Sequence, residues 1–392
     1  MKDVFIAGVG QTRIVQNGDV RGRYMAAEAL TKAFDDSNLN KDEVNALYVA
    51  NMSSGVLGNQ QQLGAVVAEA AGLSGKEAVV VEAACASGAA AVRQAYLMVA
   101  GGIHDMVAVC GIERMTHPSV NKDDITKALA MAADWELEAS KGETFISLNA
   151  RLMREYMAAY KIKHEAFAPF SINAHTNALD NPNALFHKQV DFETYTNARM
   201  IVDPLKLFDI SPVCNGAAAL IFANEKYLLA NGTSRAMDVR VVGSSMATTQ
   251  VALEKRKSLL HLDAAESATR QVLANAGVAL DDIDFFELHD AYTIMSVLSL
   301  EAAGFAKPGE GTRLGAEGRI FRNGDLPIAT MGGLKARGHP VGATGVYQIV
   351  ETYLQLSGQA GACQLNEPEM AMVQNIGGAA STVVNHILQR VR

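Results

Sequence analysis

Apolar and amphipathic segments follow one another in the same order in the two halves of the chain. A short apolar run at 4–8 predicts a buried strand, and a matching run occurs at 239–243. Each run is followed by an Ala/Glu-rich segment with helical spacing, near Ala27 and Ala265, and then by an acidic pair and a further apolar run. This repeated order of strand, helix and strand predicts a duplicated α/β fold.

The clearest repeat is a pair of helical segments that each begin and end near a glycine. Both span a glycine-to-glycine distance of 13 residues, at 88–101 and at 345–358. A helix of this length is about 20 Å long. Apolar strands follow at 106–109 and 370–373. Because near-continuous apolar strands that alternate with helices are typical of sheets buried on both faces, we expect both helices to lie between two sheets.

The predicted halves are residues 1–235 and 236–392. The first half is longer because it contains a polar, helix-rich insertion at about 117–200. A long excursion from an α/β core is commonly a lid or a ligand-binding flap, although an inert surface segment fits the same pattern. Three apolar residues near this insertion are candidates for the wall of a ligand pocket: Met115, Met131 and Phe145.

Composition and charge exclude several classes of function. With 34 basic and 42 acidic side chains the net charge is −8, and no Lys/Arg run occurs, so we expect no nucleic-acid partner. No uncharged apolar stretch approaches the roughly 20 residues of a membrane span, and the first apolar run is too short for a signal peptide. The four cysteines form no CxxC pair, which argues against a disulfide framework or a metal site and favours a cytoplasmic location.

Two residues at the starts of the repeated helices are candidates for catalysis. Cys85 lies where a buried strand leads into an Ala-rich helix, and a helix N-terminus favours the thiolate, the nucleophilic form of cysteine. His339 lies in a Gly-rich loop, 332–345, directly before the matching helix. Pseudo-symmetry predicts that the two helix starts meet, so that His339 can act as a general base for Cys85. An inert core cysteine and a histidine that caps its own turn are the structural alternatives.

Two further candidates lie at the ends of predicted strands. His289 follows the apolar run 285–288, at the strand end where α/β sheets bind ligands, although a structural cap formed with Asp290 is an equal alternative. The run that contains Asn375 ends in a glycine pair at Gly377, where backbone amides can approach a substrate and form half of an oxyanion hole. A plain glycine turn is the other interpretation.

Three motifs together resemble signatures of the thiolase superfamily: Cys85 in its CxSG turn, the GHPVGATG run at 338–345 and the NGAAA run at 215–219. The resemblance implies a duplicated five-layer αβαβα fold with two five-stranded halves and an inserted loop domain near 117–200 that binds coenzyme A. It also implies acyl-CoA substrates, no tightly bound cofactor or metal, and at least a homodimer.

The chain departs from ordinary thiolases at two positions. Those enzymes carry an Asn-Glu-Ala-Phe motif and a second catalytic cysteine in a CxGG motif, whereas this chain has HDAY at 289–292 and NIGG at 375–378. Sterol-carrier-type thiolases carry His-Asp-Cys-Phe at the first motif, where this chain has Ala291. The set resembles archaeal and bacterial thiolase-like subunits that work with a zinc-ribbon/OB-fold companion, as in acetoacetyl-CoA synthesis and the cleavage of aromatic acylsuccinyl-CoA.

One cysteine and two histidines match the triad of the ketoacyl synthases of the same superfamily. The resemblance implies that Cys85, activated by His339, takes an acyl group from acyl-CoA, with the oxyanion between the amides of Cys85 and Gly377. His289 and His339 would then stabilise the enolate of a second acyl-CoA. Because Asn375 is no base near neutral pH, His289 or a group from a partner would remove the α-proton.

The expected function is therefore the making or breaking of a 3-ketoacyl-CoA by Claisen chemistry through an acyl-Cys85 intermediate. A non-catalytic acyl-CoA-binding or scaffold subunit is the alternative that the missing second cysteine favours. A partner-dependent retro-aldolase is a third reading, against which Cys85 argues because aldol cleavage needs no acyl-enzyme.

Overall fold

Nine strands form a single twisted sheet in the computed structural model, which describes residues 2–233 and 237–391. Their order is β3-β2-β4-β7-β1-β8-β11-β10-β9. The first half supplies β1 (Val4–Gln11), β2 (Ala46–Ala50), β3 (Glu77–Val81), β4 (Met106–Arg114) and β7 (Asn215–Asn224). The second supplies β8 (Val239–Thr248), β9 (Phe285–Glu287), β10 (Met370–Gly377) and β11 (Thr382–Arg390).

The large sheet consists of two sheets that meet at one point. β1 and β8 are paired only through Phe5 and Arg240, whereas β1 is paired with β7 along its whole length. Each half therefore has its own sheet, as the repeats predict. The predicted boundary at residues 235 and 236 lies outside the described residues.

The second sheet has four strands in the described chain, not the expected five. Where the fifth would run, Ile328 makes an isolated bridge with Phe286, and the Phe286 amide donates to the carbonyl of Pro327. Proline has no N–H to donate to a ladder, so pairing does not extend along this segment.

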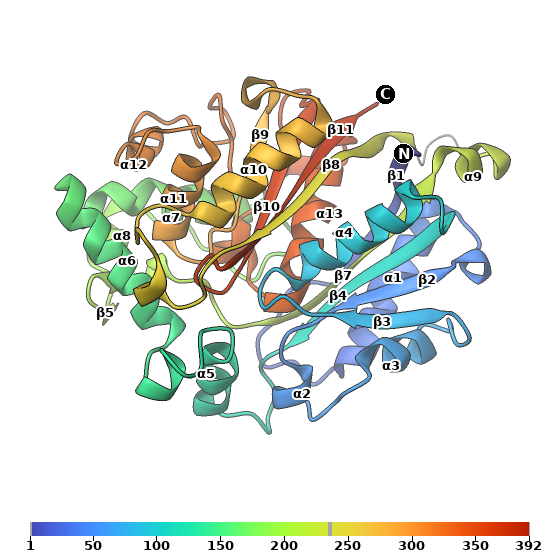
Figure 1. Cartoon of the computed structure of the whole chain (residues 1–392), viewed down its shortest axis with the longest axis horizontal. Coiled ribbons are helices and arrows are strands. Elements are labelled where there is room, and N and C mark those ends of the chain that lie inside the picture. Colours follow the sequence, from blue (N-terminus) through green and yellow to red (C-terminus); the bar gives the residue numbers. More distant parts are fainter. Residues whose placement is uncertain (1, 234–236, 392) are drawn as a thin grey trace.

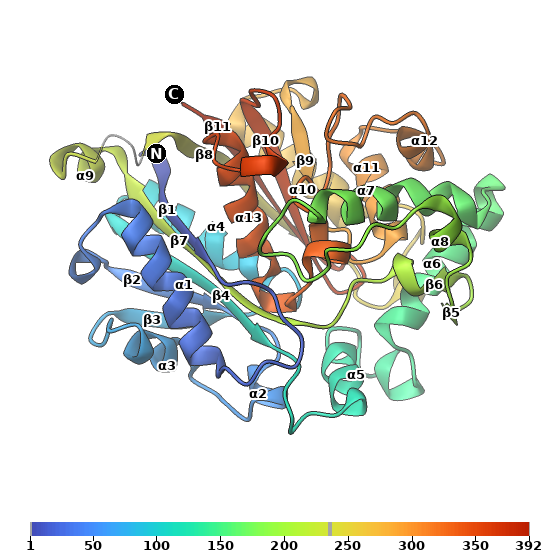
Figure 2. The same ribbon diagram turned by 180° about the vertical axis from the view of Figure 1, so that it is seen from behind.

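Helices complete five layers. α4 (Ser87–Ala100) and α13 (Thr344–Leu356) lie between the two sheets and share one apolar core with strands of both (Figure 1). The helix α1 (Gly22–Ser37) crosses the outer face of the first sheet (Figure 2), together with α3 (Leu63–Ala70). On the outer face of the second sheet lie α10 (Asp263–Ala276) and α11 (Thr293–Ala303). The predicted αβαβα arrangement is confirmed.

The two central helices touch at glycines. A Cβ atom on Gly88 would lie 2.7 Å from the backbone nitrogen of Gly345, closer than any side chain tolerates. A Cβ on Gly345 would likewise collide with the backbone of Ala89. Because both positions lack a side chain, the N-terminal turns of α4 and α13 approach one another directly, as the repeat predicts.

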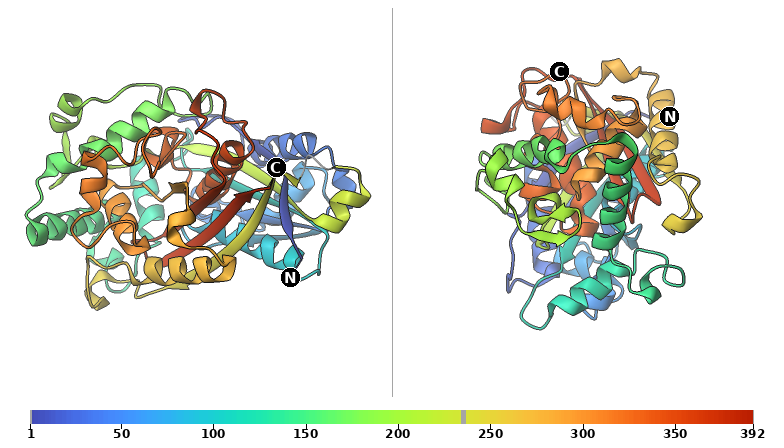
Figure 3. Two further views of the ribbon diagram at one scale, coloured as in Figure 1. Left: turned by 90° about the horizontal axis from the view of Figure 1, so that it is seen from above. Right: turned by 90° about the vertical axis from the view of Figure 1, so that its left-hand side faces the viewer.

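Most of the insertion packs against the outer side of the second half (Figure 3), whereas its first helix packs beside the first half. It contains α5 (Lys122–Ala130), α6 (Phe145–Tyr160), α7 (Ala168–Ala178) and α8 (Phe192–Thr196), followed by a hairpin of β5 (Met200–Val202) and β6 (Leu205–Lys206). Three short helices lie elsewhere: α2 (Ser54–Leu57), α9 (Glu225–Ala230) and α12 (Gly311–Ala316). Within residues 2–233 and 237–391, no helix combines the length and the apolar character that a bilayer span requires.

Candidate active site

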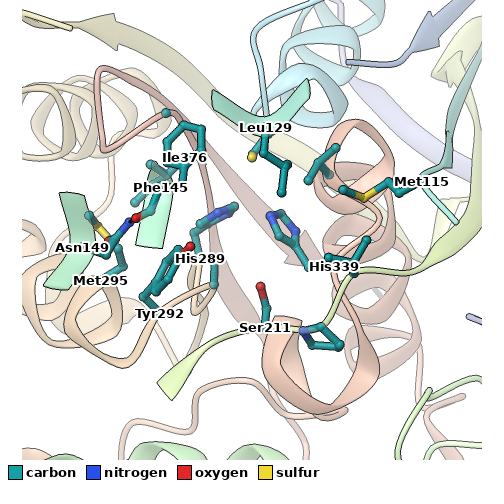
Figure 4. A pocket seen from close by; sticks show the side chains of 16 residues that line it. Met115, Leu129, Phe145, Asn149, Ser211, His289, Tyr292, Met295, His339 and Ile376 are labelled. Atoms are coloured by element: carbon teal, nitrogen blue, oxygen red, sulfur yellow. Dashed lines mark hydrogen bonds between the residues drawn. The ribbon is translucent and has the colours of Figure 1, made fainter. Parts of the chain in front are cut away.

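A cavity of about 60 Å³ lies where the two halves and the insertion meet. Its wall contains the three residues predicted to carry catalysis, Cys85, His289 and His339, and the side chains of both histidines point into the same space (Figure 4). Of the predicted apolar wall residues, Met115 and Phe145 line the cavity, whereas Met131 does not and is 58% exposed. Leu129 and Asn149 of the insertion also reach this wall.

The local backbone presents Cys85 at a sharp turn between β3 and α4. Ala84 adopts a left-handed conformation with φ of 52°, which reverses the chain within one residue. The Ser87 hydroxyl stabilises the turn, because it accepts from the Ala83 amide at 2.9 Å and donates to the Ala84 carbonyl at 2.6 Å. Cys85 therefore lies just before the first turn of α4 with its side chain in the cavity.

The thiol of Cys85 is strongly stabilised in its protonated form. Burial, followed by the nearby Glu113 carboxylate, raises the pKa of Cys85 to about 12, and the backbone amide at the turn opposes this rise by a smaller amount. The backbone amide at the helix start favours the thiolate, as predicted, but desolvation outweighs it in the resting protein, so the thiol stays protonated. Attack by Cys85 needs a base that takes its proton.

This raised pKa predicts how alkylation of Cys85 depends on pH. Since the fully protonated thiol predominates below the folded-state pKa, the reactive thiolate fraction should increase about tenfold for each pH unit. We expect the rate constant for iodoacetamide labelling of Cys85 to rise in this way from pH 7 to 9, as measured by peptide mass spectrometry. A plateau that begins near pH 7 would instead indicate a cysteine–histidine ion pair.

His339 is held by the Gly-rich loop in front of α13. Its Nδ1 lies 2.7 Å from the hydroxyl of Thr344, the first residue of that helix. Gly338 before it has φ of 119°, and a Cβ there would lie 2.7 Å from Ile14. Burial, followed by the neighbouring His289 and Arg337, holds the pKa of His339 well below its usual value, so the imidazole is neutral.

His289 faces His339 from the end of β9. The two rings are perpendicular, with centroids 5.1 Å apart. The side-chain nitrogen of Asn375 lies 3.1 Å from Nδ1 of His289. Burial, followed by the charge of Arg337, lowers the pKa of His289 to about 3. Both imidazoles are thus neutral at physiological pH, so each has one nitrogen that carries a proton and one that carries a lone pair.

Asn375 and Gly377 lie at the end of β10, beside the start of α4. The Asn375 carbonyl oxygen accepts from the Ala89 amide at 3.4 Å. Gly377 is next to the cavity, because its neighbours Ile376 and Gly378 both line the wall. A side chain at Gly377 would strike the Ala83 carbonyl, so glycine allows the β10 backbone to approach the Cys85 turn.

The sequence analysis missed Glu113, whose carboxylate connects two loops beside the site by hydrogen bonds. Its buried carboxylate accepts from the amides of Met52 at 2.9 Å and Gly342 at 3.0 Å, and from Asn51 Nδ2 at 3.0 Å. It thereby fixes the loop of His339 against the chain that follows β2. An acidic residue near the end of the otherwise apolar strand β4 was the available signal. The described residues contain no group of three or more His, Cys, Asp or Glu suited to a metal ion.

Comparisons with known proteins agree with this architecture. The thiolase N-terminal domain model matches residues 4–226, and the thiolase C-terminal domain model matches residues 245–390. An acetyl-CoA acetyltransferase of Methanothermobacter thermautotrophicus is 40% identical over 392 residues, which is all of both chains. The benzoylsuccinyl-CoA thiolase subunit BbsB of Thauera aromatica is 28% identical, with 96% of this chain and 95% of that protein covered.

A solved structure has the same fold. The Ltp2-ChsH2(DUF35) aldolase superposes with a TM-score of 0.83 at 23% identity, over 100% of this chain and 98% of that one. Duplicated sheets, paired central helices and matching domain models over both halves all lead to one conclusion. The chain belongs to the thiolase family and is an acyltransferase of the thiolase type.

Proposed function

We propose that this chain makes or cleaves a 3-ketoacyl-CoA by Claisen chemistry through an acyl group carried on Cys85. The observation that carries the proposal is the meeting of Cys85, His289 and His339 at one cavity wall, with both imidazoles neutral. A nucleophile beside a neutral base is the arrangement that covalent acyl transfer requires. A scaffold subunit would need neither the thiol nor the two imidazoles.

In the acylation step, His339 takes the proton of the Cys85 thiol while sulfur attacks the thioester carbonyl. The backbone amides of Cys85 and Gly377 are the proposed donors to the resulting oxyanion. When the tetrahedral intermediate collapses, the C–S bond to coenzyme A breaks and the leaving thiolate takes the proton from His339. The products are acyl-Cys85 and free coenzyme A.

The two carbon–carbon reactions use the same acyl-enzyme. In condensation, a second acyl-CoA loses an α-proton, and its enolate attacks acyl-Cys85 to form the 3-ketoacyl-CoA and release the thiol. In the reverse direction, Cys85 attacks the 3-keto group and the enolate leaves. Acetyl-CoA and acetoacetyl-CoA are the first substrates to test, since the Methanothermobacter relative is an acetyl-CoA acetyltransferase. The Thauera relative adds aromatic acylsuccinyl-CoA esters to the set.

The insertion at about 117–200 is the proposed binding domain for coenzyme A. Three of its side chains reach the cavity wall: Leu129, Phe145 and Asn149. An apolar wall from an added segment suits the acyl and pantetheine parts of the substrate. Coenzyme A esters are substrates in this proposal, and the chain carries out the reaction without a tightly bound cofactor or metal.

We also propose a homodimer, in which a second copy covers β3. This strand is at one edge of the sheet, and Val79 and Val80 on it are 44% and 42% exposed. An apolar edge strand left open to water invites pairing with another strand. The four cysteines are free thiols, which supports a reducing, cytoplasmic location.

Mass spectrometry and turnover assays test the proposed function. Incubation with acetyl-CoA should add one acetyl group to the intact chain, and peptide mapping should place it on Cys85. Thiolysis of acetoacetyl-CoA and of an aromatic acylsuccinyl-CoA would then identify the acyl group. If neither an acyl-enzyme nor turnover is observed, with or without a zinc-ribbon/OB-fold companion protein, the scaffold alternative is favoured.

We expect the homodimer alone to be a poor catalyst that a zinc-ribbon/OB-fold companion activates. The fold relative is a thiolase-fold chain solved with a DUF35 protein. Closure of the pocket against water by such a partner would strengthen each electrostatic contact inside it. Adding the companion from the native host should raise kcat by roughly tenfold or more, the equivalent of about 1.4 kcal/mol. Full turnover without the companion, and no gain on its addition, would contradict this.

A further inference from the structure

The side-chain amide of Asn375 has a defined orientation. Its Oδ1 accepts from the Ala89 backbone amide, at the N-terminal turn of α4. Its Nδ2 therefore faces His289, with 3.1 Å between Nδ2 and Nδ1 of the imidazole. An amide nitrogen donates hydrogen bonds and does not accept them, so Nδ1 of His289 is the acceptor.

This hydrogen bond determines where His289 carries its proton. A neutral imidazole has one N–H and one lone pair. With the lone pair on Nδ1 engaged by Asn375, the proton of His289 is on Nε2. His289 is also only 3% exposed. It is therefore a hydrogen-bond donor on the cavity side, and Nε2 has no lone pair with which to accept a proton.

His339 has the opposite arrangement. The hydroxyl of Thr344 donates its single proton to the Pro340 carbonyl, at 3.3 Å. The arrangement that satisfies both contacts has the hydroxyl oxygen accept from Nδ1–H of His339, 2.7 Å away. The lone pair of His339 is consequently on Nε2. Two perpendicular imidazoles 5.1 Å apart thus have complementary functions, one as donor and one as base.

Resting on the proposed function, we infer that Asn375 is a positioning residue that holds His289 as an Nε2–H donor and leaves His339 as the base for both halves of the reaction. Asn375 stands where ordinary thiolases carry a second cysteine. The residue at this position would orient an imidazole instead of transferring a proton. His289 would then not be the base that the sequence alone left as one option.

The proton balance closes with His339 alone. After acylation, Nε2 of His339 has given the thiol proton to the departing coenzyme A. This nitrogen again carries a lone pair. It then removes the α-proton of the second acyl-CoA, while Nε2–H of His289 donates to the enolate oxygen. The enolate carbon forms the new bond to the acyl carbon, the C–S bond to Cys85 breaks, and His339 returns the proton to sulfur.

Asn375→Asp is the most direct test, because aspartate has nearly the same shape and can still accept from Ala89. Its carboxylate has no N–H, so it accepts from Nδ1–H and moves the lone pair of His289 to Nε2. In the ¹⁵N-histidine-labelled full chain at pH 8.5, we expect the wild type to show His289 protonated at Nε2 and His339 at Nδ1. The variant should show His289 protonated at Nδ1, with signals assigned through His→Gln variants.

Kinetics supply the second readout. Loss of the donor should slow the carbon–carbon step by roughly 10²–10³, while acetylation of Cys85 by acetyl-CoA stays within a few-fold of wild type. Asn375→Leu, which removes the donor without adding an acceptor, should give the same selective loss. Asn385→Asp is the matched control, a buried asparagine on the neighbouring strand β11 that contacts Thr269 and not a histidine.

Two results would overturn the inference: wild-type His289 protonated at Nδ1, or an equal loss of acylation and carbon–carbon chemistry in Asn375→Asp. A selective loss in the Asn385→Asp control would also contradict it. Failure of the proposed function gives a different signature, since the wild-type chain would then form no acyl-Cys85 at all. The NMR assignment of the two tautomers decides the inference about Asn375 in that case too.

Discussion

Replacing Cys85 with alanine is expected to abolish acyl-enzyme formation and to lower kcat by roughly 10⁴-fold or more. Every step of the proposed reaction passes through a bond to this sulfur, and the cavity wall holds no other cysteine among the described residues. Intact mass after incubation with acetyl-CoA, together with the rate of acetoacetyl-CoA thiolysis, measures both effects. The fold should persist, because the side chain occupies a cavity wall and donates no structural hydrogen bond in the described chain.

Cys363→Ala is the matched control for this experiment. Cys363 is also a buried free thiol, but it lies against the Asn177 carbonyl and does not line the cavity. This variant should acylate and turn over like the wild type. Retention of full thiolysis by Cys85→Ala would show that another group forms the covalent bond, or that the reaction has no acyl-enzyme.

Variants of the two histidines are expected to differ in the acylation step. His339→Ala should slow acetylation of Cys85, because a thiol with a pKa near 12 depends on a base to release its proton. His289→Ala should acetylate at nearly the wild-type rate and lose carbon–carbon bond formation and cleavage. Losses of roughly 10²–10⁴ are expected in each case. Single-turnover acetylation and steady-state thiolysis separate the two effects.

His175→Ala is a suitable control for these variants. His175 is another buried histidine whose pKa burial lowers, to about 4, and it belongs to α7 of the insertion and not to the cavity wall. We expect both of its rates to stay near those of the wild type. An equal loss of acylation in His289→Ala and His339→Ala would refute the division of labour.

Most of the architecture could be predicted from the sequence because the two duplicated halves keep similar spacings between corresponding residues. The equal glycine-to-glycine spacing of 88–101 and 345–358 predicts two equivalent helices, and Gly88 and Gly345 are indeed where they touch. The prediction of a fifth strand in the second sheet was wrong, because that sheet has four strands in the described chain. Pro327 has no N–H to donate, and its segment pairs with β9 only through the bridge between Ile328 and Phe286. This limited pairing is visible only in the structure.

The candidate residues could be found from their positions at the ends of strands and helices, but their chemistry could not. The protonated state of Cys85 depends on burial in a cluster that includes Ala128 of the insertion, and on Glu113 from another strand. His289 contacts Asn375, which is 86 positions away in the sequence. Such contacts depend on the direction of side chains in three dimensions, which no periodic pattern encodes.

The place of β1 in the sheet has a consequence for biosynthesis. The ribosome makes β1 before the other described strands, yet its partner β7 follows far along the chain, where Val4 pairs with Asn224. At about 5 to 20 residues per second, translation needs roughly 10 to 45 s to deliver that partner. Throughout this interval the backbone N–H and C=O groups of the apolar strand β1 have no strand partner on either side, a state that promotes aggregation. The sheet of the first half can therefore form only after β7 has left the ribosome.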